Sequence, residues 1–360
     1  MKICFVLPGY TRQPIGGFKI VYEYANQLIS RGHQVSLLCI NKNIMGKYHL
    51  PRILKKLAAN YFTKHEPKWF DLNPTVKKIS CTSWMYKRKL DDYDIVIATS
   101  VDSVSYVMES FCDKPKAYLI QDFENWKYDD DYCYRTYSMP MLNIVVSSWL
   151  KTIVEPYSLV KPIVIKNPID LSSYRVIVPP DSRKVHTIGF LYHAMEHKGV
   201  VYSIEAMHKL KQLFPDLDVY TFGVPEKPSD LPEWVHYTQC ATKEETIDIY
   251  NKVSVWICTS IKEGFGLTGL EAMACGAALA SSAYTGALEY AKDGYNAYLS
   301  PIKDTEALVK NVCTLFNNDA ERYRIIDNGI SSVKEFSYDM AAQKMETALQ
   351  EYISKKNPKV

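Results

Sequence analysis

The sequence predicts an α/β protein made of two Rossmann-like domains, each a doubly wound parallel sheet. Its 360 residues exceed one ordinary core and suit two domains. A hydrophobic content of 47% and a charged content of 23% are typical of a globular chain and exclude wholesale disorder. Apolar strand-like runs alternate with helical patterns in two successive series, which is the pattern of parallel α/β sheets.

The first series opens on an apolar strand, Lys2–Leu7, too short for the hydrophobic region of a signal peptide. A helical pattern follows Gly16-Gly17 and stops at Gly32, and Gln34–Ile40 is the next strand. The stretch 42–89 is expected to be irregular, basic and helical in part. Further buried strands are predicted at 94–98, 116–120, 143–146 and 162–165.

The second series begins near His186 and again alternates strands with helices. The predicted strands are 186–191, 218–222, 253–258 and 277–281, and the predicted helices are 200–214, 243–251, 267–274, 304–317, 320–328 and about 338–353. We therefore expect an N-terminal domain of residues 1–168, joined by a C-terminal helix of about 338–354, and a second domain of residues 169–337. Ligands of open α/β sheets bind at the carboxyl ends of the strands, so the two domains should face each other across a deep cleft.

The distribution of charge and the spacing of the cysteines indicate which kinds of partner and which cellular compartment the sequence favours. Twelve lysines and arginines lie between Lys42 and Lys89 against only Glu66 and Asp71. This segment is either a solvated face or a surface for an anionic partner such as a membrane; no nucleic-acid-binding module accompanies it. Nine cysteines without paired spacing favour a reducing cytoplasm and no zinc site.

Several common catalytic motifs are absent from the sequence. No G-x-G-x-x-G follows the first strand, which disfavours a dinucleotide oxidoreductase, and no G-x-x-x-x-G-K-[ST] is present, which disfavours a P-loop enzyme. Neither a G-x-S-x-G elbow nor an H-E-x-x-H helix occurs.

The most informative segment is Glu263–Gly276, which follows a predicted strand. Gly264, Gly266 and Gly269 leave the backbone bare, so we expect a ligand to approach it closely. The helix predicted from Leu267 offers unpaired N–H groups at its positive end, a site suited to a diphosphate. Glu263 and Glu271 flank this segment, and carboxylates accept hydrogen bonds from sugar hydroxyls.

The spacing Glu263-x7-Glu271, with Gly-Phe-Gly-Leu and Glu-Ala-Met-Ala-Cys-Gly, resembles the signature of retaining glycosyltransferase family 4, which has the GT-B fold. The resemblance extends over nearly the whole chain through weaker matches in the expected order. These are Gly16-Gly17, Arg31–Val35, Asn167–Asp170, Lys198-Gly199, Phe222-Gly223 and the closing helix Phe336–Tyr352.

This resemblance implies a role for each matching residue. Glu271 would hold the nucleotide ribose and Glu263 the donor sugar, while the backbone of Gly264, Phe265, Gly266, Leu267 and Thr268 would contact the diphosphate and the sugar. Lys198 would neutralise the leaving diphosphate. Gly16 and Gly17 would let the N-terminal loop approach the diphosphate, and the end of the strand at Gly223 would lie near the base.

Two positions depart from the family pattern. The family usually places an arginine before its phosphate lysine; here His193 is the stand-in, and a neutral imidazole is a weaker partner for a diphosphate. Gln121 stands where the family often has a histidine facing the donor. The segment Gln121-Asp122-Phe123-Glu124 resembles a branch that includes bacterial rhamnosyltransferases of surface polysaccharides. Asp122 and Glu124 either face the acceptor or are ordinary surface carboxylates.

The sequence thus predicts a cytoplasmic, metal-independent, retaining hexosyltransferase that uses a UDP-, dTDP- or GDP-linked sugar and needs no cofactor. Its acceptor would be a glycan or a lipid-linked glycan of a cell-surface polysaccharide. Aromatic residues of the first domain suggest a sugar-binding groove, and segment 42–89 would place the enzyme on the inner face of the membrane. The alternatives are a GT-B nucleotide-sugar epimerase and a sugar-nucleotide-binding protein without catalysis.

Overall fold

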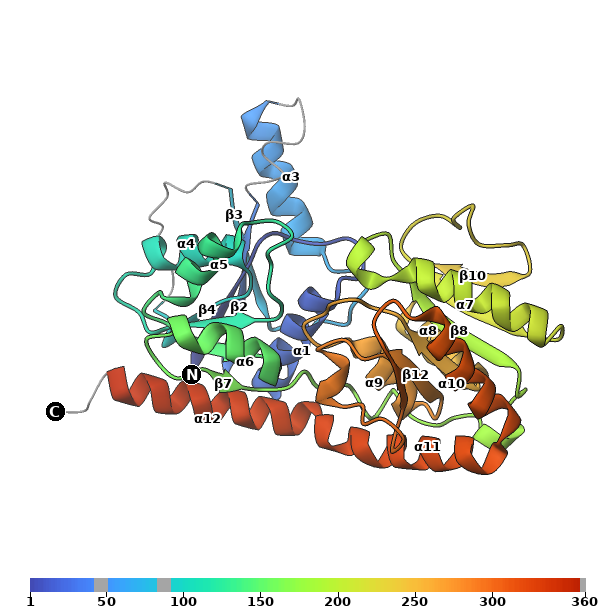
Figure 1. Cartoon of the computed structure of the whole chain (residues 1–360). Coiled ribbons are helices and arrows are strands. Elements are labelled where there is room, and N and C mark those ends of the chain that lie inside the picture. Colours follow the sequence, from blue (N-terminus) through green and yellow to red (C-terminus); the bar gives the residue numbers. More distant parts are fainter. Residues whose placement is uncertain (42–50, 83–91, 357–360) are drawn as a thin grey trace. The chain divides into compact units, whose positions relative to one another are not determined.

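The computed structural model describes residues 1–41, 51–82 and 92–356, and it contains two compact units (Figure 1). Unit 1 comprises Met1–Asn167 together with the residues from Tyr338 onward, and unit 2 comprises Pro168–Ser337. Each unit is built around its own parallel sheet, and each is described by itself.

Unit 1 holds a seven-stranded sheet in the order β3-β2-β1-β4-β5-β6-β7, in which every pair is parallel. Phe5 of β1 lies between Leu37 of β2 and Ile97 of β4, so the central strand is paired on both sides. The strands are β1 (Lys2–Leu7), β2 (Gln34–Ile40), β3 (Lys77–Cys81), β4 (Ile95–Ala98), β5 (Lys116–Ile120), β6 (Leu142–Val145) and β7 (Ile163–Val164).

Some helices of unit 1 begin at capping residues and pack through their apolar faces. At the start of α4 the hydroxyl of Ser103 accepts hydrogen bonds from the N–H groups of Thr99 (2.9 Å) and Ser100 (3.1 Å). The last helix, α12, packs on α1, and Glu346 of α12 binds both Arg31 (3.2 Å) and His33 (3.0 Å). The helices are α1 (Gly16–Ser30), α3 (Arg52–His65), α4 (Val101–Ser110), α5 (Asp130–Tyr137), α6 (Ser148–Val154), the short 3-10 helix η1 (Glu155–Tyr157) and α12 (Tyr338–Lys356).

Unit 2 holds a six-stranded parallel sheet in the order β10-β9-β8-β11-β12-β13. The strands are β8 (Thr187–Tyr192), β9 (Asp218–Gly223), β10 (Val235–Gln239), β11 (Val255–Cys258), β12 (Ala278–Ser282) and β13 (Tyr298–Ser300). The helices are η2 (Pro180–Ser182), η3 (Glu196–Lys198), α7 (Val200–Leu213), α8 (Lys243–Lys252), α9 (Leu267–Ala274), η4 (Ala287–Glu289), α10 (Thr305–Asn317), α11 (Asp319–Ser332) and η5 (Val333–Phe336).

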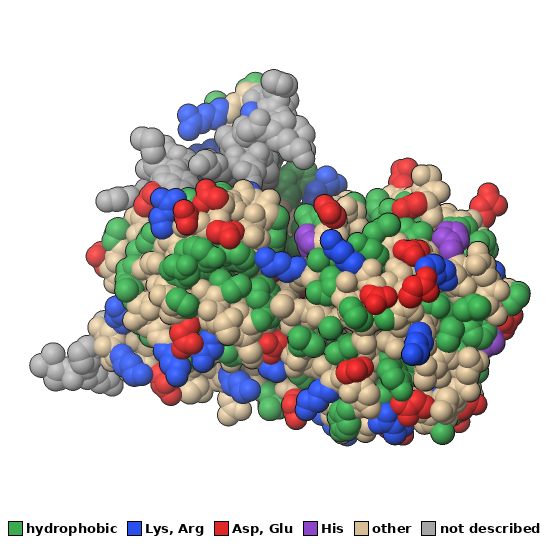
Figure 2. Space-filling view, in the orientation of Figure 1, with side chains coloured by type: hydrophobic (Ala, Val, Ile, Leu, Met, Phe, Trp, Pro, Cys, Tyr) green, Lys and Arg blue, Asp and Glu red, His purple; other side chains and the backbone are tan. Residues whose placement is uncertain are grey.

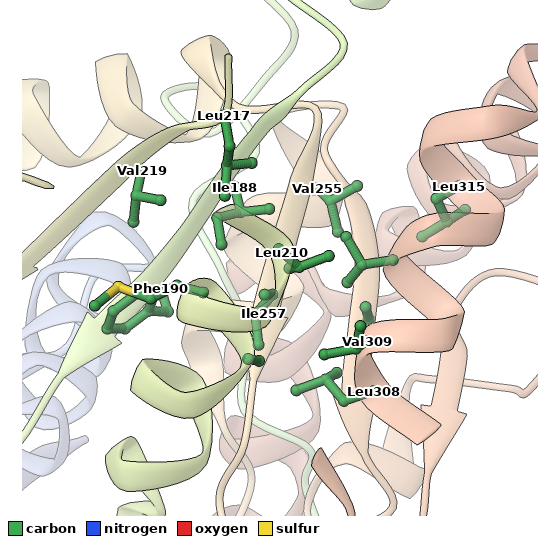
Figure 3. Close-up of a cluster of buried hydrophobic side chains, with 14 of the residues drawn as sticks. Ile188, Phe190, Leu210, Leu217, Val219, Val255, Ile257, Leu308, Val309 and Leu315 are labelled. Atoms are coloured by element: carbon green, nitrogen blue, oxygen red, sulfur yellow. The ribbon is translucent and has the colours of Figure 1, made fainter. Parts of the chain in front are cut away.

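Successive side chains of the central strand β11 point to opposite faces of the sheet of unit 2. Val255 and Ile257 of β11 point into a cluster with side chains of β8, α7 and α10 (Figure 3). Trp256, between them, points to the other face, where it packs on Tyr250 with ring centroids 4.6 Å apart. A Cβ at Gly189 would come within 2.6 Å of the Trp256 ring, so glycine is required beside this indole.

The predicted fold class is confirmed, since both sheets are parallel and covered by helices. The stretch 42–89 is helical in part, as expected, through α3, and it also contains the edge strand β3, which was not predicted. Residues 42–50 and 83–91, with Trp84 and Tyr86, lie outside the described residues. Among the helices described, none combines the length and the apolar character that a membrane span requires. The facing cleft stays a prediction.

Candidate functional site

The candidate site of unit 2 lies at the switch point of its sheet. Here β8 and β11 are neighbours, with β9 and β10 on one side and β12 and β13 on the other. The chain leaves such a pair of strands in opposite directions, which opens a crevice at their carboxyl ends. The loop after β8 carries His193 and Lys198, and the loop after β11 carries Glu263.

Lys198 and Glu263 form an ion pair at this point. Lys198 Nζ lies 2.8 Å from Glu263 Oε2, and the side chains are 23% and 17% exposed. The hydroxyl of Ser260 donates a hydrogen bond to the other carboxylate oxygen, Oε1. Each charge therefore has a partner, and each side chain keeps a part of its surface exposed.

Glycine at position 199 makes this pairing geometrically feasible. Gly199 has φ +61°, and a Cβ there would lie 2.1 Å from the carbonyl oxygen of Thr259. The loop after β8 thus packs directly against the backbone at the end of β11, and the carbonyl of His197 accepts from the N–H of Ile261 (2.8 Å). Any side chain at 199 would push Lys198 away from Glu263.

The charges of the two loops set their protonation. Burial opposes ionisation of Glu263, but Lys198 and the Ser260 hydroxyl outweigh it, so the pKa of Glu263 lies below its ordinary value. Burial and the positive charge of Lys198 lower the pKa of His193. Its Nδ1 accepts from the N–H of Met195 (3.2 Å), which places the proton of the neutral ring on Nε2. His193 is therefore a neutral hydrogen-bond donor.

The N-terminus of α9 adjoins the loop that carries Glu263. The helix begins after Gly266, which has φ +87°, and no side chain caps it. Its first N–H groups carry the positive end of the helix dipole, so an anion at this end is stabilised. Phe265 is buried beneath the loop, and Leu267 and Thr268 form the first turn.

Two tyrosines that sequence analysis missed support this loop from within the unit. The hydroxyl of Tyr290 donates to the carbonyl oxygen of Gly266 (2.7 Å), and it lies 3.1 Å from the hydroxyl of Tyr284. A Cβ at Gly266 would come within 2.0 Å of the Tyr284 hydroxyl, and a Cβ at Gly269 within 2.5 Å of the Tyr290 hydroxyl. The approach of a ligand to these glycines stays a prediction, and the tyrosine pair gives a second reason for glycine at positions 266 and 269.

Glu271 is more enclosed than a surface carboxylate. It is 5% exposed, and its Oε2 accepts from the hydroxyl of Tyr250 at 3.0 Å. Burial, and then the charge of Glu271, raise the pKa of Tyr250 well above its ordinary value, so the phenol stays a donor. The tyrosine is held in turn by Trp256. The ribose contact of Glu271 stays a prediction, and it would use a carboxylate that is already positioned.

Gly223 ends β9 on the far side of β8. A Cβ there would lie 2.7 Å from the carbonyl oxygen of Tyr192 and 2.8 Å from the hydroxyl of Tyr237. The carbonyl oxygen of Gly223 accepts from the N–H of Cys240, which has a positive φ of 49°. This turn presents backbone groups near the strand end, and the predicted contact with a base stays a prediction.

In unit 1, two of the predicted residues meet at the carboxyl ends of β1 and β5. Gln121 Nε2 donates to the carbonyl oxygen of Gly17 (3.1 Å), and a Cβ at Gly17 would touch the Gln121 amide at 3.4 Å. Gly16 and Gly17 form the first turn of α1 rather than a loop before it, and a Cβ at Gly16 would meet open space.

The two carboxylates after β5 have different surroundings. Asp122 accepts from the N–H of the next residue, Phe123 (2.8 Å). Glu124 accepts from the N–H of Val101 (3.2 Å) at the start of α4. Burial, with the nearby charges of Asp102 and Asp122, raises the pKa of Glu124 to about 7 despite that hydrogen bond and Lys127.

Aromatic side chains gather beside this edge of unit 1. Phe123, Tyr134 and Tyr157 stack in sequence, with ring centroids 5.6 Å and 4.2 Å apart. Tyr128 stacks on Tyr132 at 4.8 Å, and Trp126 is exposed. Figure 2 shows hydrophobic side chains, a class that includes tyrosine, over α5 and α6 on the face in view. Flat aromatic surfaces of this kind are suited to sugar rings.

Signals for some of these residues were absent from the sequence. Ser260, Tyr250, Tyr284 and Tyr290 act through partners 3 to 24 positions away, and no motif marks such pairs. Among the residues described, no group of three His, Cys, Asp or Glu side chains is arranged to hold a metal ion.

Comparison with known proteins gives matches in both sequence and structure. Residues 180–332 match the model of the family described as glycosyl transferases group 1. An N,N'-diacetylbacillosaminyl-diphospho-undecaprenol alpha-1,3-N-acetylgalactosaminyltransferase of Campylobacter jejuni is 26% identical over 159 residues, 42% of this chain and 41% of that protein. Alpha-maltose-1-phosphate synthase of Mycolicibacterium smegmatis is 26% identical over 214 residues, 50% of this chain and 54% of that protein. The matched segments thus span about half or less of these curated relatives.

Solved structures resemble the chain over nearly its full length. Sucrose-phosphate synthase from Thermosynechococcus elongatus gives a TM-score of 0.75 at 15% identity, covering 98% of this chain and 99% of that one. Anabaena HepE, solved in complex with UDP and glucose, gives 0.75 at 16% identity, covering 98% and 100%. At these identities the likeness concerns the fold.

Proposed function

Because this chain belongs to the glycosyl transferases group 1 family, also called glycosyltransferase family 4, and has the GT-B fold, we propose that it is a retaining hexosyltransferase. It moves a sugar from a nucleoside diphosphate donor to a glycan or lipid-linked acceptor in the synthesis of a cell-surface polysaccharide. The observation that carries the proposal is the Lys198–Glu263 pair at the switch point of unit 2, beside the open N-terminus of α9.

The donor half of the reaction uses this arrangement directly. A diphosphate placed at the start of α9 meets the positive end of the helix and Lys198, and the negative charge on that diphosphate grows as the glycosidic bond breaks. Glu263, released from Lys198, is free to accept hydrogen bonds from donor hydroxyls. These charges supply the stabilisation that a metal ion gives in other transferases, so no metal cofactor is required.

Retention of the anomeric configuration requires either a protein nucleophile or a front-face reaction. The amide of Gln121 is no base at any pH, and Glu263 is occupied with hydroxyls, so we infer a front-face reaction. In that reaction the leaving phosphate oxygen accepts the proton of the acceptor hydroxyl while the new glycosidic bond forms on the same face. Gln121, held by Gly17, orients the sugar, and Asp122 lies on the acceptor side.

The aromatic residues of unit 1 support a glycan acceptor. The stack of Phe123, Tyr134 and Tyr157 and the exposed Trp126 lie within the same unit as Gln121. One relative offers a matching acceptor chemistry, because the name of the Campylobacter protein describes a sugar on a diphospho-undecaprenol lipid. Several structural neighbours were solved in complex with UDP or UDP-glucose, so a UDP-sugar is the first donor to test, before dTDP- and GDP-sugars.

The test has two stages. Thermal shift with UDP, GDP, dTDP and ADP identifies the nucleotide, because a ligand that binds only the folded state raises its apparent stability, by about 2.7 kcal/mol at a hundred times Kd. The matching nucleotide sugars are then incubated with the enzyme, with and without lipid-linked glycans, and the products are examined by NMR. We expect donor consumption that depends on the acceptor and a product with the donor's anomeric configuration.

Other outcomes would identify the alternatives. Conversion of the donor alone into its epimer would assign the chain as a nucleotide-sugar epimerase. Tight nucleotide binding without any turnover across the panel would favour a binding protein. An inverted product would overturn the front-face reaction while leaving the donor site in place.

A further inference from the structure

Helix α3 of unit 1 carries an apolar face that points away from its own unit. Ile53, Leu54, Leu57 and Tyr61 are between 50% and 75% exposed. Their spacing of one, four and eight positions puts them within about 100° of one another around a helix of 3.6 residues per turn. Scattered exposed apolar residues are ordinary, but four on one narrow face are not.

The opposite side of α3 is the one that anchors it. Ala59 and Thr63 are buried, and the Thr63 hydroxyl accepts from Asn41 Nδ2 (2.9 Å) just after β2. Phe62 stacks on Tyr10 with centroids 5.5 Å apart. All these contacts lie in the C-terminal half, and Figure 1 shows the N-terminal end of α3 standing clear of the sheet of its unit. The exposed face is therefore not a core face left open by chance.

The charge of α3 has one sign. The helix contains Arg52, Lys55, Lys56 and Lys64 and no aspartate or glutamate. A basic helix with a narrow apolar face and low mean hydropathy is suited to lie in the plane of a membrane interface. Each lysine or arginine near an anionic bilayer adds attraction, which salt screens.

We propose that α3 docks this protein on an anionic lipid bilayer, with Ile53, Leu54, Leu57 and Tyr61 inserted among the acyl chains and the basic residues against the headgroups. The apolar face and the basic charge together select this occupant, because an anionic bilayer offers acyl chains to the apolar side chains and negative headgroups to the basic ones. Such docking brings the unit that carries the aromatic residues near any lipid-linked acceptor. Only that last consequence rests on the proposed function, since bilayer binding requires no activity.

The experiment measures sedimentation of the full chain with vesicles of phosphatidylglycerol and phosphatidylcholine, and with phosphatidylcholine alone. We expect binding to the anionic vesicles that weakens steeply as salt rises. The double variant Ile53→Ser/Leu57→Ser should lower the partition coefficient roughly a hundredfold, the effect of removing two large apolar side chains from the lipid. Lys56→Gln/Lys64→Gln should lower it roughly tenfold or more and flatten the salt dependence.

The matched control is Val201→Ser/Leu213→Ser, which removes two equally exposed apolar residues from α7 of unit 2. It should bind vesicles as the unchanged protein does, and thermal unfolding should verify that both double variants remain folded. Equal binding of the α3 variant and the control would overturn the proposal. So would salt-independent binding to neutral vesicles, or light scattering that shows a dimer lost in the α3 variant, which would make a second copy the occupant.

Discussion

Glu263 and Glu124 hold similar places in their two units but opposite environments. Each follows a parallel strand, β11 in unit 2 and β5 in unit 1, where α/β proteins build their sites. Lys198 and Ser260 hold the pKa of Glu263 below its ordinary value, whereas burial and neighbouring carboxylates raise the pKa of Glu124 to about 7. Partners, rather than position in the fold, decide the charge of each carboxylate.

The difference has a functional meaning. Unit 2 keeps a full positive and a full negative charge in contact, ready for an anionic ligand to take over the lysine. Unit 1 has the uncharged amide of Gln121 at its strand end and, beside the negative charges of Asp102 and Asp122, a Glu124 carboxyl whose pKa is about 7. We therefore expect substitutions in unit 2 to affect phosphate chemistry, and those in unit 1 to affect orientation and pH response.

The largest expected effect is that of Lys198→Ala, set against Gln121→Ala. Loss of Lys198 should lower kcat by roughly a hundredfold or more, because its charge acts on the departing diphosphate. Loss of Gln121 removes one hydrogen bond, worth ~1–2 kcal/mol or about tenfold in rate. Steady-state kinetics of both variants, with Lys310→Ala as an exposed control, checks the ranking; equal losses in the two would erase the proposed division between the units.

Replacing Glu263 by glutamine should separate binding from catalysis. The amide keeps the size of the side chain and its bond with Ser260, but it no longer competes for Lys198. Nucleoside diphosphate should then bind as tightly as before or a few-fold more tightly, while kcat falls by about tenfold or more because donor hydroxyls lose a charged acceptor. Calorimetry with the nucleotide, beside kinetics with Glu244→Gln as control, measures both. Weaker nucleotide binding would contradict the proposal that Lys198 leaves Glu263 to bind the diphosphate.

The tyrosine support of the α9 loop is tested by Tyr290→Phe. Removing its hydroxyl leaves the buried carbonyl of Gly266 without this donor, which costs about 1–3 kcal/mol. Affinity for a nucleoside diphosphate should fall by about tenfold, while affinity for the nucleoside should not change, because only the phosphates meet the start of α9. Tyr284→Phe, which keeps the bond to Gly266, should have a smaller effect. Equal losses for both ligands would make Tyr290 a purely structural residue.

The smallest effect on turnover is expected for Glu124, whose influence is on the free energy of unfolding as a function of pH. Its folded-state pKa of about 7 lies above the ordinary value of 4.5, so the folded state binds the proton more tightly and stability falls as pH rises from about 4.5 to 7. Glu124→Gln should remove this loss, which is a gain of about 3 kcal/mol at pH 8, since each pKa unit corresponds to about 1.4 kcal/mol, and little change at pH 4.5. Urea unfolding at both pH values measures it, with the exposed Glu109→Gln as control; a gain equal at both pH values would argue against titration of Glu124.

Long apolar strands and the Glu263–Gly276 segment were predictable from sequence because their signals are local. The strands β3, β10 and β13 were missed, since edge strands such as Lys77–Cys81 are bordered on one side only and carry polar residues. The pairing of Lys198 with Glu263 was not predicted from the spacing, since 65 residues separate them and only the sheet order brings them together. The role of Gly266 was likewise visible only once Tyr284 was placed.

The chain order of unit 1 bears on how the protein is synthesised. Its sheet is complete by Asn167, yet α12 begins only at Tyr338. This helix packs on α1, buries its own Met345 and Leu349, and binds Arg31 through Glu346. On the ribosome, therefore, unit 2 is finished while the apolar face of α1 still awaits its last helix. During that interval unit 1 is the part exposed to misassociation, so chaperones should favour nascent chains that end before Tyr338.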